Sequence, residues 1–168
     1  MYISRYRTPK EYGDLIMASD GEYLTALLFD GSKNTEDLKT LGEEQSLTIF
    51  EETKRWLDIY FTGKDPGFLP RMKFENLSSF RAKVLEKLLR IPYGRLVSYG
   101  DIAREIAKEE GINKMSAQAV GRAVGRNPIC IIVPCHRVLG AGGKLTGYGG
   151  GLENKKALLK LEKIAFKE

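Results

Sequence analysis

Residues 129–138 read Ile-Cys-Ile-Ile-Val-Pro-Cys-His-Arg-Val, which brings the only histidine of the chain next to one of its two cysteines. The five apolar residues 129–133 are rich in β-branched side chains and too few for a helix, so they predict a short buried strand. Pro134 has no amide proton and favours an extended residue before it, which should end the strand. We therefore expect Cys135 to lie at a turn on the edge of a sheet.

The residues around this turn favour a nucleophilic role for Cys135. A free thiol titrates near ~8.5 and reacts as the thiolate, so it needs a base or a positive field, and His136 and Arg137 are the local candidates. Neighbouring side chains of an extended segment point to opposite faces, so a bridging water rather than a direct bond should link Cys135 to His136. Cys130 lies inside the predicted strand with no polar neighbour and is expected to be a packing residue.

Zinc binding is the alternative use of these side chains. Two cysteines and one histidine supply three soft ligands at most, and they lack the paired Cys-x-x-Cys spacing of structural zinc sites. We expect neither a metal nor another cofactor.

The length of 168 residues fits one domain or two small ones with a real core. No apolar run approaches the ~20 residues that a membrane helix needs, and two cysteines give no disulfide framework. Residues 1–10 mix basic residues with tyrosines and lack the apolar core of a secretory signal. We expect a cytoplasmic monomer that does not contact a membrane.

Charge is divided unevenly along the chain. Residues 1–73 contain ten Lys and Arg against thirteen Asp and Glu, whereas residues 74–168 contain seventeen against nine. A solvated lysine-rich face is the simplest explanation of such an excess, but its restriction to one half favours a polyanionic partner for that half.

The first half predicts a small α/β domain. Leu15–Ser19 and residues 22–29 flank Asp20-Gly21, a two-residue signal for a tight hairpin. Between Leu47 and Phe61, apolar residues recur at spacings of three and four, which predicts an amphipathic helix. We identify no chemistry in this half. Glycine and proline at residues 62–67 end the helix, so we divide the chain into domains of residues 1–73 and 74–168.

The second half predicts a mainly α domain. One helix should follow Ser78, and Ser98-x-x-Asp101 is a capping signal for the next. A turn at residues 109–111 precedes a third helix that begins near Ser116. A helix, a short turn and a second helix resemble a helix-turn-helix.

The helix after Ser116 contains two glycines, each of which costs ~1 kcal/mol relative to alanine inside a helix. Small residues recur every fourth position on one face, and a polar stripe adjoins it. The small face has two possible explanations, which are tight packing against the sheet and close approach to DNA. The adjoining arginines favour DNA. The small face comprises Ala117, Gly121 and Gly125, and the polar stripe comprises Gln118, Arg122 and Arg126.

Pro134-Cys135-His136-Arg137-Val138, with Asn127-Pro128 before it and residues 146–148 and 150–152 after it, resembles the O6-alkylguanine-DNA alkyltransferases. The similarity extends back through Phe80, residues 91–94 and residues 97–103, and so covers residues 75 to 165 in order. It implies a ribonuclease-H-like first domain and a winged helix-turn-helix second domain. It also implies DNA repair by single-turnover transfer of an alkyl group from O6-alkylguanine, and from O4-alkylthymine, in double-stranded DNA to Cys135.

The resemblance also implies roles for individual residues, because a base inside a duplex must be rotated out of the stack before Cys135 can reach it. A relay would run from Cys135 through water to His136 and Glu162, with Asn127 bracing the turn. Tyr99 would contact the phosphate and the target base. The flipped base would be enclosed by Tyr148, Gly149 and Gly150, and the minor groove of the DNA would be contacted by Ala117, Gln118, Gly121, Arg122 and Arg126.

One residue departs from the family pattern. The family has an arginine that fills the gap left by the flipped nucleotide, and the corresponding residue here is Gln118, so Arg122 is an alternative for that role.

Two other functions remain open. A winged-helix protein could bind DNA lesions without chemistry, although Cys135 argues against it, and a cysteine hydrolase would leave the basic helical pair without a function.

Overall fold

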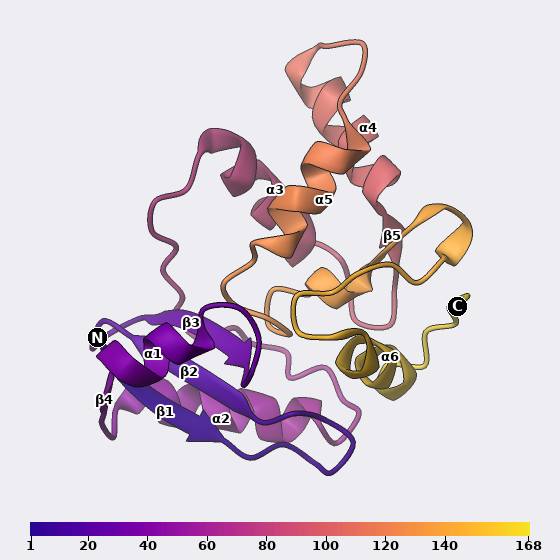
Figure 1. Ribbon diagram of the computed structural model, residues 1–168. Coiled ribbons are helices and arrows are strands. Elements are labelled where there is room, and N and C mark those ends of the chain that lie inside the picture. The colour runs from indigo at the N-terminus through magenta and orange to yellow at the C-terminus, as the bar shows by residue number, and fades with distance from the viewer.

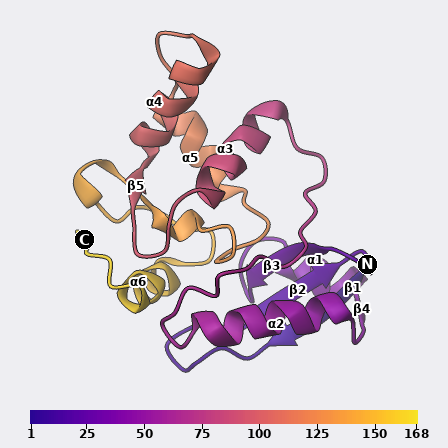
Figure 2. The same ribbon diagram turned by 180° about the vertical axis from the view of Figure 1, so that it is seen from behind.

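The computed structural model describes residues 1–168, and its N-terminal part is built on a four-stranded sheet with the strand order β3-β2-β1-β4. Strands β1 (Tyr2–Tyr6), β2 (Leu15–Ser19) and β3 (Leu24–Phe29) are antiparallel, and β4 (Glu43–Glu44) runs parallel to β1. One face of the sheet is covered by a short helix and the other by a long one, as Figures 1 and 2 show from opposite sides.

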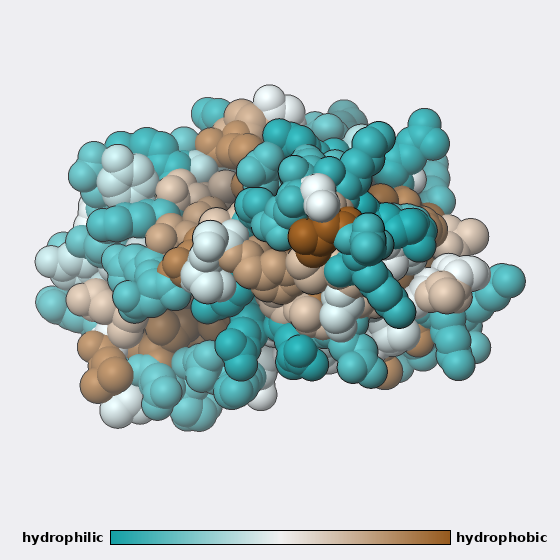
Figure 3. Space-filling model, turned by 90° about the horizontal axis from the view of Figure 1, so that it is seen from above, coloured by the Kyte–Doolittle hydropathy of each residue, from teal (hydrophilic) through white to brown (hydrophobic).

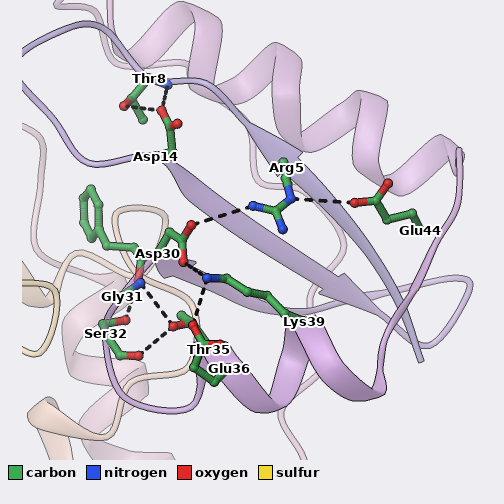
Figure 4. Close-up of polar contacts among 11 residues, drawn as sticks. Arg5, Thr8, Asp14, Asp30, Gly31, Ser32, Thr35, Glu36, Lys39 and Glu44 are labelled. Atoms are coloured by element: carbon green, nitrogen blue, oxygen red, sulfur yellow. Dashed lines mark hydrogen bonds and ion pairs between the residues drawn. The ribbon is translucent and has the colours of Figure 1, made fainter.

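The short helix is α1 (Thr35–Leu41), and ion pairs join it to the sheet (Figure 4). Arg5 of β1 lies 3.7 Å from Asp30 and 3.6 Å from Glu44, and Lys39 of α1 contacts the same Asp30. These side chains are partly exposed, so each pair contributes at most about 1 kcal/mol.

The long helix is α2 (Thr48–Tyr60), which confirms the helix predicted between Leu47 and Phe61. Its apolar stripe faces the sheet and is buried from Ile49 to Tyr60. Tyr60, the last residue of the helix, is fully buried at the end that lies near the C-terminal part.

The predicted hairpin between β2 and β3 is confirmed, but its two-residue turn is wrong. The Asp20 carboxylate accepts hydrogen bonds from the backbone N–H groups of Glu22 and Tyr23 at 3.0 and 2.9 Å. Side-chain bonds of this kind hold the backbone in a turn and compete with strand pairing. Strand β3 therefore begins at Leu24 rather than at Glu22.

The C-terminal part is helical and contains α3 (Ser79–Leu89), α4 (Tyr99–Glu110), α5 (Ala117–Gly125) and α6 (Leu152–Leu161). The serines that precede α3, α4 and α5 each accept a hydrogen bond from the N–H group three residues on, at 3.0 to 3.2 Å. Ser98 and Asp101 complete a reciprocal capping box. The predicted helix starts are confirmed because these caps depend on local sequence alone.

Helices α4 and α5 pack against each other as the predicted helix-turn-helix pair, with α5 between α3 and α4 (Figure 1). A small parallel sheet joins β5 (Val97–Ser98) to β6 (Val138–Leu139), so the start of α4 is tied to the chain just after Cys135. The expected architecture, a small α/β domain followed by a mainly helical domain with a helix-turn-helix pair, is confirmed.

Residues 129–133 are buried, as predicted, but they do not form a strand. Only Ile129 pairs with the sheet, through a bridge to Leu27 of β3. The chain then turns: Ile131 has a φ of 69°, and the N–H of Val133 donates to the carbonyl of Ile129 at 3.2 Å. Apolar side chains predicted the burial correctly, whereas local hydrogen bonds decided the conformation.

One apolar core runs through both halves, and it includes Leu27 and Tyr60 from the first and Ile106, Val133 and Leu158 from the second. The face seen from above is mostly hydrophilic, with apolar residues in several separate patches (Figure 3). No helix has both the length and the apolar character needed to cross a membrane.

Candidate active site

A cavity of about 840 Å³ lies between β3, α5 and the loop after the small sheet. Cys135 and Cys130 both line it. It brings together eight of the residues predicted from sequence, namely Tyr99, Gly121, Arg126, Asn127, Cys135, Tyr148, Gly149 and Gly150. A second hollow, of about 690 Å³, is lined by Ala117 and Gln118 and shares Tyr99 and Gly121 with the first.

Cys135 begins a short 3-10 turn, Cys135–Arg137, rather than continuing an extended segment. Asn127 holds the preceding loop closed, because its side-chain N–H groups donate to the carbonyls of Ile129 and Val133 at 3.1 and 2.9 Å. Its side-chain oxygen accepts from the N–H of Ile129 at 3.0 Å. The buried Asn127 amide thus replaces the sheet pairing that residues 129–133 lack.

The surroundings of the Cys135 thiol favour its ionised form. Hydrogen bonding with the Cys130 thiol is the largest cause, and it acts with Asn127, Tyr148 and the charge of Lys155 against burial, which opposes ionisation. Together they lower the pKa of Cys135 to about 7. The thiolate is therefore far more accessible near neutral pH than it is for an ordinary cysteine. Cys130 is buried as predicted, and the Cys135 thiol has the largest influence on its pKa, which is raised.

His136 is fully buried and pairs with Glu162, whose Oε2 lies 2.5 Å from the His136 Nε2. Burial lowers the pKa of His136, although the bond to Glu162 opposes this. A neutral His136 donates a hydrogen bond from its Nε2–H group to the carboxylate. Nδ1 is then the ring nitrogen that can accept a proton. The Nδ1 atom is buried and has no hydrogen-bond partner within the protein.

Glu162 directly follows α6 and is the residue that caps the C-terminal end of that helix. Arg137 Nε donates to its Oε1 at 2.7 Å, and the N–H of Gly94 donates to the same atom at 3.0 Å. Burial raises the pKa of Glu162, but the hydrogen bond with His136, the positive charge that His136 takes on in acid and the charge of Arg137 outweigh it, and the pKa falls to about 2. Glu162 is ionised at any physiological pH.

Sequence reasoning missed Tyr60. Its hydroxyl donates to Glu162 Oε2 at 2.6 Å, so the first half, in which the sequence indicated no chemistry, contributes a hydrogen bond to the site. The available signal was that a tyrosine on the buried stripe of the helix needs a hydrogen-bond partner for its hydroxyl. Sequence spacing could not identify that partner, which lies 102 residues away.

Lys155 was also missed. It is fully buried on α6, donates to the Val138 carbonyl at 2.9 Å and lies 5.8 Å from the centre of the Tyr148 ring. Burial lowers its pKa to about 8, and its charge favours the Cys135 thiolate. Its spacing of three and four from Leu158 and Leu159 could have identified it as a lysine on a buried face.

The aromatic residues predicted for the site line the cavity. Tyr99 accepts a hydrogen bond from Thr146 at 3.3 Å, and the Tyr148 hydroxyl is buried beside the Cys135 thiol, whose pKa it helps to lower. A side chain at Gly150 would place its Cβ 2.5 Å from the Phe29 ring, which explains why glycine is needed there. No group of three or more His, Cys, Asp or Glu side chains is placed to hold a metal ion.

Helix α5 packs through Val120, Ala123 and Val124, and its predicted polar stripe of Gln118, Arg122 and Arg126 is exposed. A Cβ at Gly121 would lie 3.8 Å from the Tyr99 ring, and one at Gly125 would meet nothing within 4 Å. The small-residue face is therefore open rather than pressed against the sheet.

This fold and site define a protein with a helical DNA-binding unit and a reactive thiol in a cavity beside it. Residues 1–68 match the ribonuclease-like domain of 6-O-methylguanine DNA methyltransferase, and residues 79–164 match its DNA-binding domain. The chain thus belongs to the O6-methylguanine DNA methyltransferase family, the methylated-DNA-protein-cysteine methyltransferases that repair alkylated DNA.

Individual relatives agree over nearly the whole chain. The methylated-DNA-protein-cysteine methyltransferase of Mycobacterium tuberculosis is 50% identical over 94% of this chain and 92% of its own, and that of Methanosarcina acetivorans is 41% identical over 96% and 98%. A crystal structure of the M. tuberculosis O6-methylguanine methyltransferase gives a TM-score of 0.80 at 40% identity, over 96% of this chain and 92% of that one. The same protein in complex with DNA gives 0.79 at 37% identity, over 97% and 93%. The two alternative functions, a lesion-binding protein without chemistry and a cysteine hydrolase, lose their support.

Proposed function

We propose that Cys135 accepts the alkyl group from O6-alkylguanine in double-stranded DNA, with His136 and Glu162 as its proton relay. The observation that carries this proposal is the pairing of His136 Nε2 with an ionised Glu162, because it leaves Nδ1 free to take the thiol proton through a bridging water.

The thiolate attacks the alkyl carbon, a C–S bond forms and the bond from that carbon to the guanine oxygen breaks. The Tyr148 hydroxyl, which lines the cavity, would donate a hydrogen bond to the departing guanine oxygen, and the proton that neutralises the guanine would be the one that the relay took from the thiol. O4-alkylthymine carries its alkyl group on an exocyclic oxygen and would react in the same way. Since no group at the site can hydrolyse the thioether product, each molecule reacts once.

DNA docking is assigned to residues 74–168, with residues 1–73 as a separate domain. Ala117, Gln118, Gly121, Arg122 and Arg126 would enter the minor groove, where small residues allow close approach. Tyr99 lines both hollows and would crowd the phosphate beside the flipped base. We propose that the protein acts as a monomer in the reducing cytoplasm, where the Cys135 thiol stays free.

Replacing His136 by alanine is expected to slow transfer about 10²-fold or more, the usual contribution of a general base. The apparent pKa of the thiol in the pH-rate profile should rise, because Cys135 loses its proton acceptor. Single-turnover transfer from a methylguanine duplex, measured from pH 5 to 9, tests both effects. A profile identical to that of the wild type would remove His136 from the mechanism.

Gln118→Arg is expected to raise the transfer rate on duplex DNA more than on the free modified base, which needs no flipping. A guanidinium stacks on bases and donates several hydrogen bonds, whereas the shorter amide carries no charge, and filling the gap recovers part of the few kcal/mol that flipping costs.

Arg122→Ala is the matched comparison on the same exposed stripe. It should weaken duplex binding and reduce the dependence of binding on salt, because the face that would enter the minor groove loses one positive charge. Equal stimulation of both substrates by Gln118→Arg would show that Gln118 does not occupy the gap.

A further inference from the structure

Tyr60 connects the sheet domain to the reactive site. It is fully buried at the end of α2, and its ring packs at centroid distances of 5.2 Å from Trp56 and 6.4 Å from His136. Its hydroxyl lies 2.6 Å from Glu162 Oε2 and 3.4 Å from His136 Nε2. No other side chain of residues 1–73 forms a hydrogen bond with His136 or Glu162.

The hydrogen bonds around Glu162 have a defined direction. Burial and the Glu162 charge raise the pKa of Tyr60 well above its usual value, so the phenol keeps its proton and donates it. Glu162 Oε2 thus accepts hydrogen bonds from Tyr60 and His136, and Oε1 accepts hydrogen bonds from Arg137 and from the N–H of Gly94. A carboxylate has about four acceptor positions, and all of them are used here.

We propose that Tyr60 is a positioning residue for alkyl transfer: its hydroxyl fixes Glu162 and takes a share of the negative charge that Oε2 presents to His136. The sheet domain thereby influences how readily His136 accepts the Cys135 proton. This inference rests on the proposed role of His136.

The proposal predicts a direction for the effect of removing the hydroxyl. Without it, the charge on Oε2 acts on His136 alone, which stabilises the imidazolium and raises the pKa of His136. The other ionisable groups that face this pair are unchanged by the substitution; they are Arg137, Tyr93, Lys155, Cys135 and Tyr12.

Tyr60→Phe keeps the ring and removes only the hydroxyl. The acid limb of its pH-rate profile should move to higher pH by about half a unit to one unit, part of the value of a hydrogen bond to a charged group. His136 is the only histidine, so NMR titration of its imidazole in untagged protein reports the same pKa independently of activity.

Tyr6→Phe is the matched control. The Tyr6 hydroxyl also donates to a carboxylate at 2.6 Å, that of Asp58 on α2, but this bond is exposed and does not touch Glu162. Tyr6→Phe should keep the wild-type His136 titration and acid limb. Fluorotyrosine at residue 60, a stronger donor, should move both to lower pH, and it serves if Tyr60→Phe does not fold.

A Tyr60→Phe protein that transfers methyl groups with the wild-type acid limb and His136 titration, and loses only stability, would overturn the positioning role. Failure of the wild-type protein to transfer at all would instead overturn the proposed function, and this inference with it.

Discussion

Cys135→Ser is expected to abolish methyl transfer and to leave binding to duplex DNA unchanged. A serine hydroxyl has no accessible ionised form near neutral pH, whereas the environment of Cys135 lowers the thiol pKa to about 7. The exposed stripe of α5 is untouched by this substitution. Transfer from a labelled methylguanine duplex and binding by fluorescence anisotropy, measured on the same preparation, check both parts.

Cys130→Ser is the control for this substitution. It changes a thiol in the same cavity, and its hydroxyl can still hydrogen-bond to Cys135, so transfer should persist with a modest rise in the apparent pKa of the reactive thiol. Transfer that survived in Cys135→Ser and was lost in Cys130→Ser would reverse the assignment of the two cysteines.

Glu162→Ala is expected to lower the free energy of unfolding by about 3–5 kcal/mol, the cost of removing one partner of a buried ion pair. Arg137, His136 and Tyr60 each lose an acceptor in a site where water does not replace it. Urea unfolding at pH 7 measures the change. Glu153→Ala on the same helix is the control, because that side chain is 90% exposed and pairs only with Lys156, and its effect should stay within about 0.5 kcal/mol.

The effect of Glu162 also depends on pH. Its pKa in the folded protein is about 2 against an ordinary value of 4.5, so its ionised form contributes stability that is fully present above pH 4.5 and is lost as the pH falls towards 2. The difference in unfolding free energy between the wild type and Glu162→Ala should therefore narrow across that range. Equal stability of Glu162→Ala and Glu153→Ala at pH 7 would mean that the buried network does not support the fold.

The parts of the fold that the sequence predicted are those that depend on nearby residues. Ser78, Ser98 and Ser116 cap the helices that they were expected to begin, because a cap involves residues three apart. The stripe of α2 faces the core because period alone determines which residues share a face.

The wrong predictions have identifiable competitors. In residues 129–133, the buried Asn127 amide satisfies backbone carbonyls that a strand would have paired across a sheet, and composition does not reveal that choice. At Asp20, a side-chain carboxylate extended the hairpin turn in the same manner. In both places a short polar side chain took over hydrogen bonds that secondary structure would otherwise make.

The site was predicted in part, because local residue chemistry indicated Cys135 and His136 and the family resemblance indicated Glu162. The contact between Tyr60 and Glu162 could not be predicted, since it depends on how two domains pack and no periodicity links residues so far apart.

The most direct test of Cys135 as the alkyl acceptor is the mass of the intact protein, followed by peptide mapping, after incubation with a duplex that contains one O6-methylguanine. The expected result is a gain of one methyl group in place of one hydrogen. That gain should lie on the peptide containing Cys135, in one copy per molecule even with excess DNA. Loss of the methyl group from the DNA with an unmodified protein, or with the methyl group on another residue, would contradict the account.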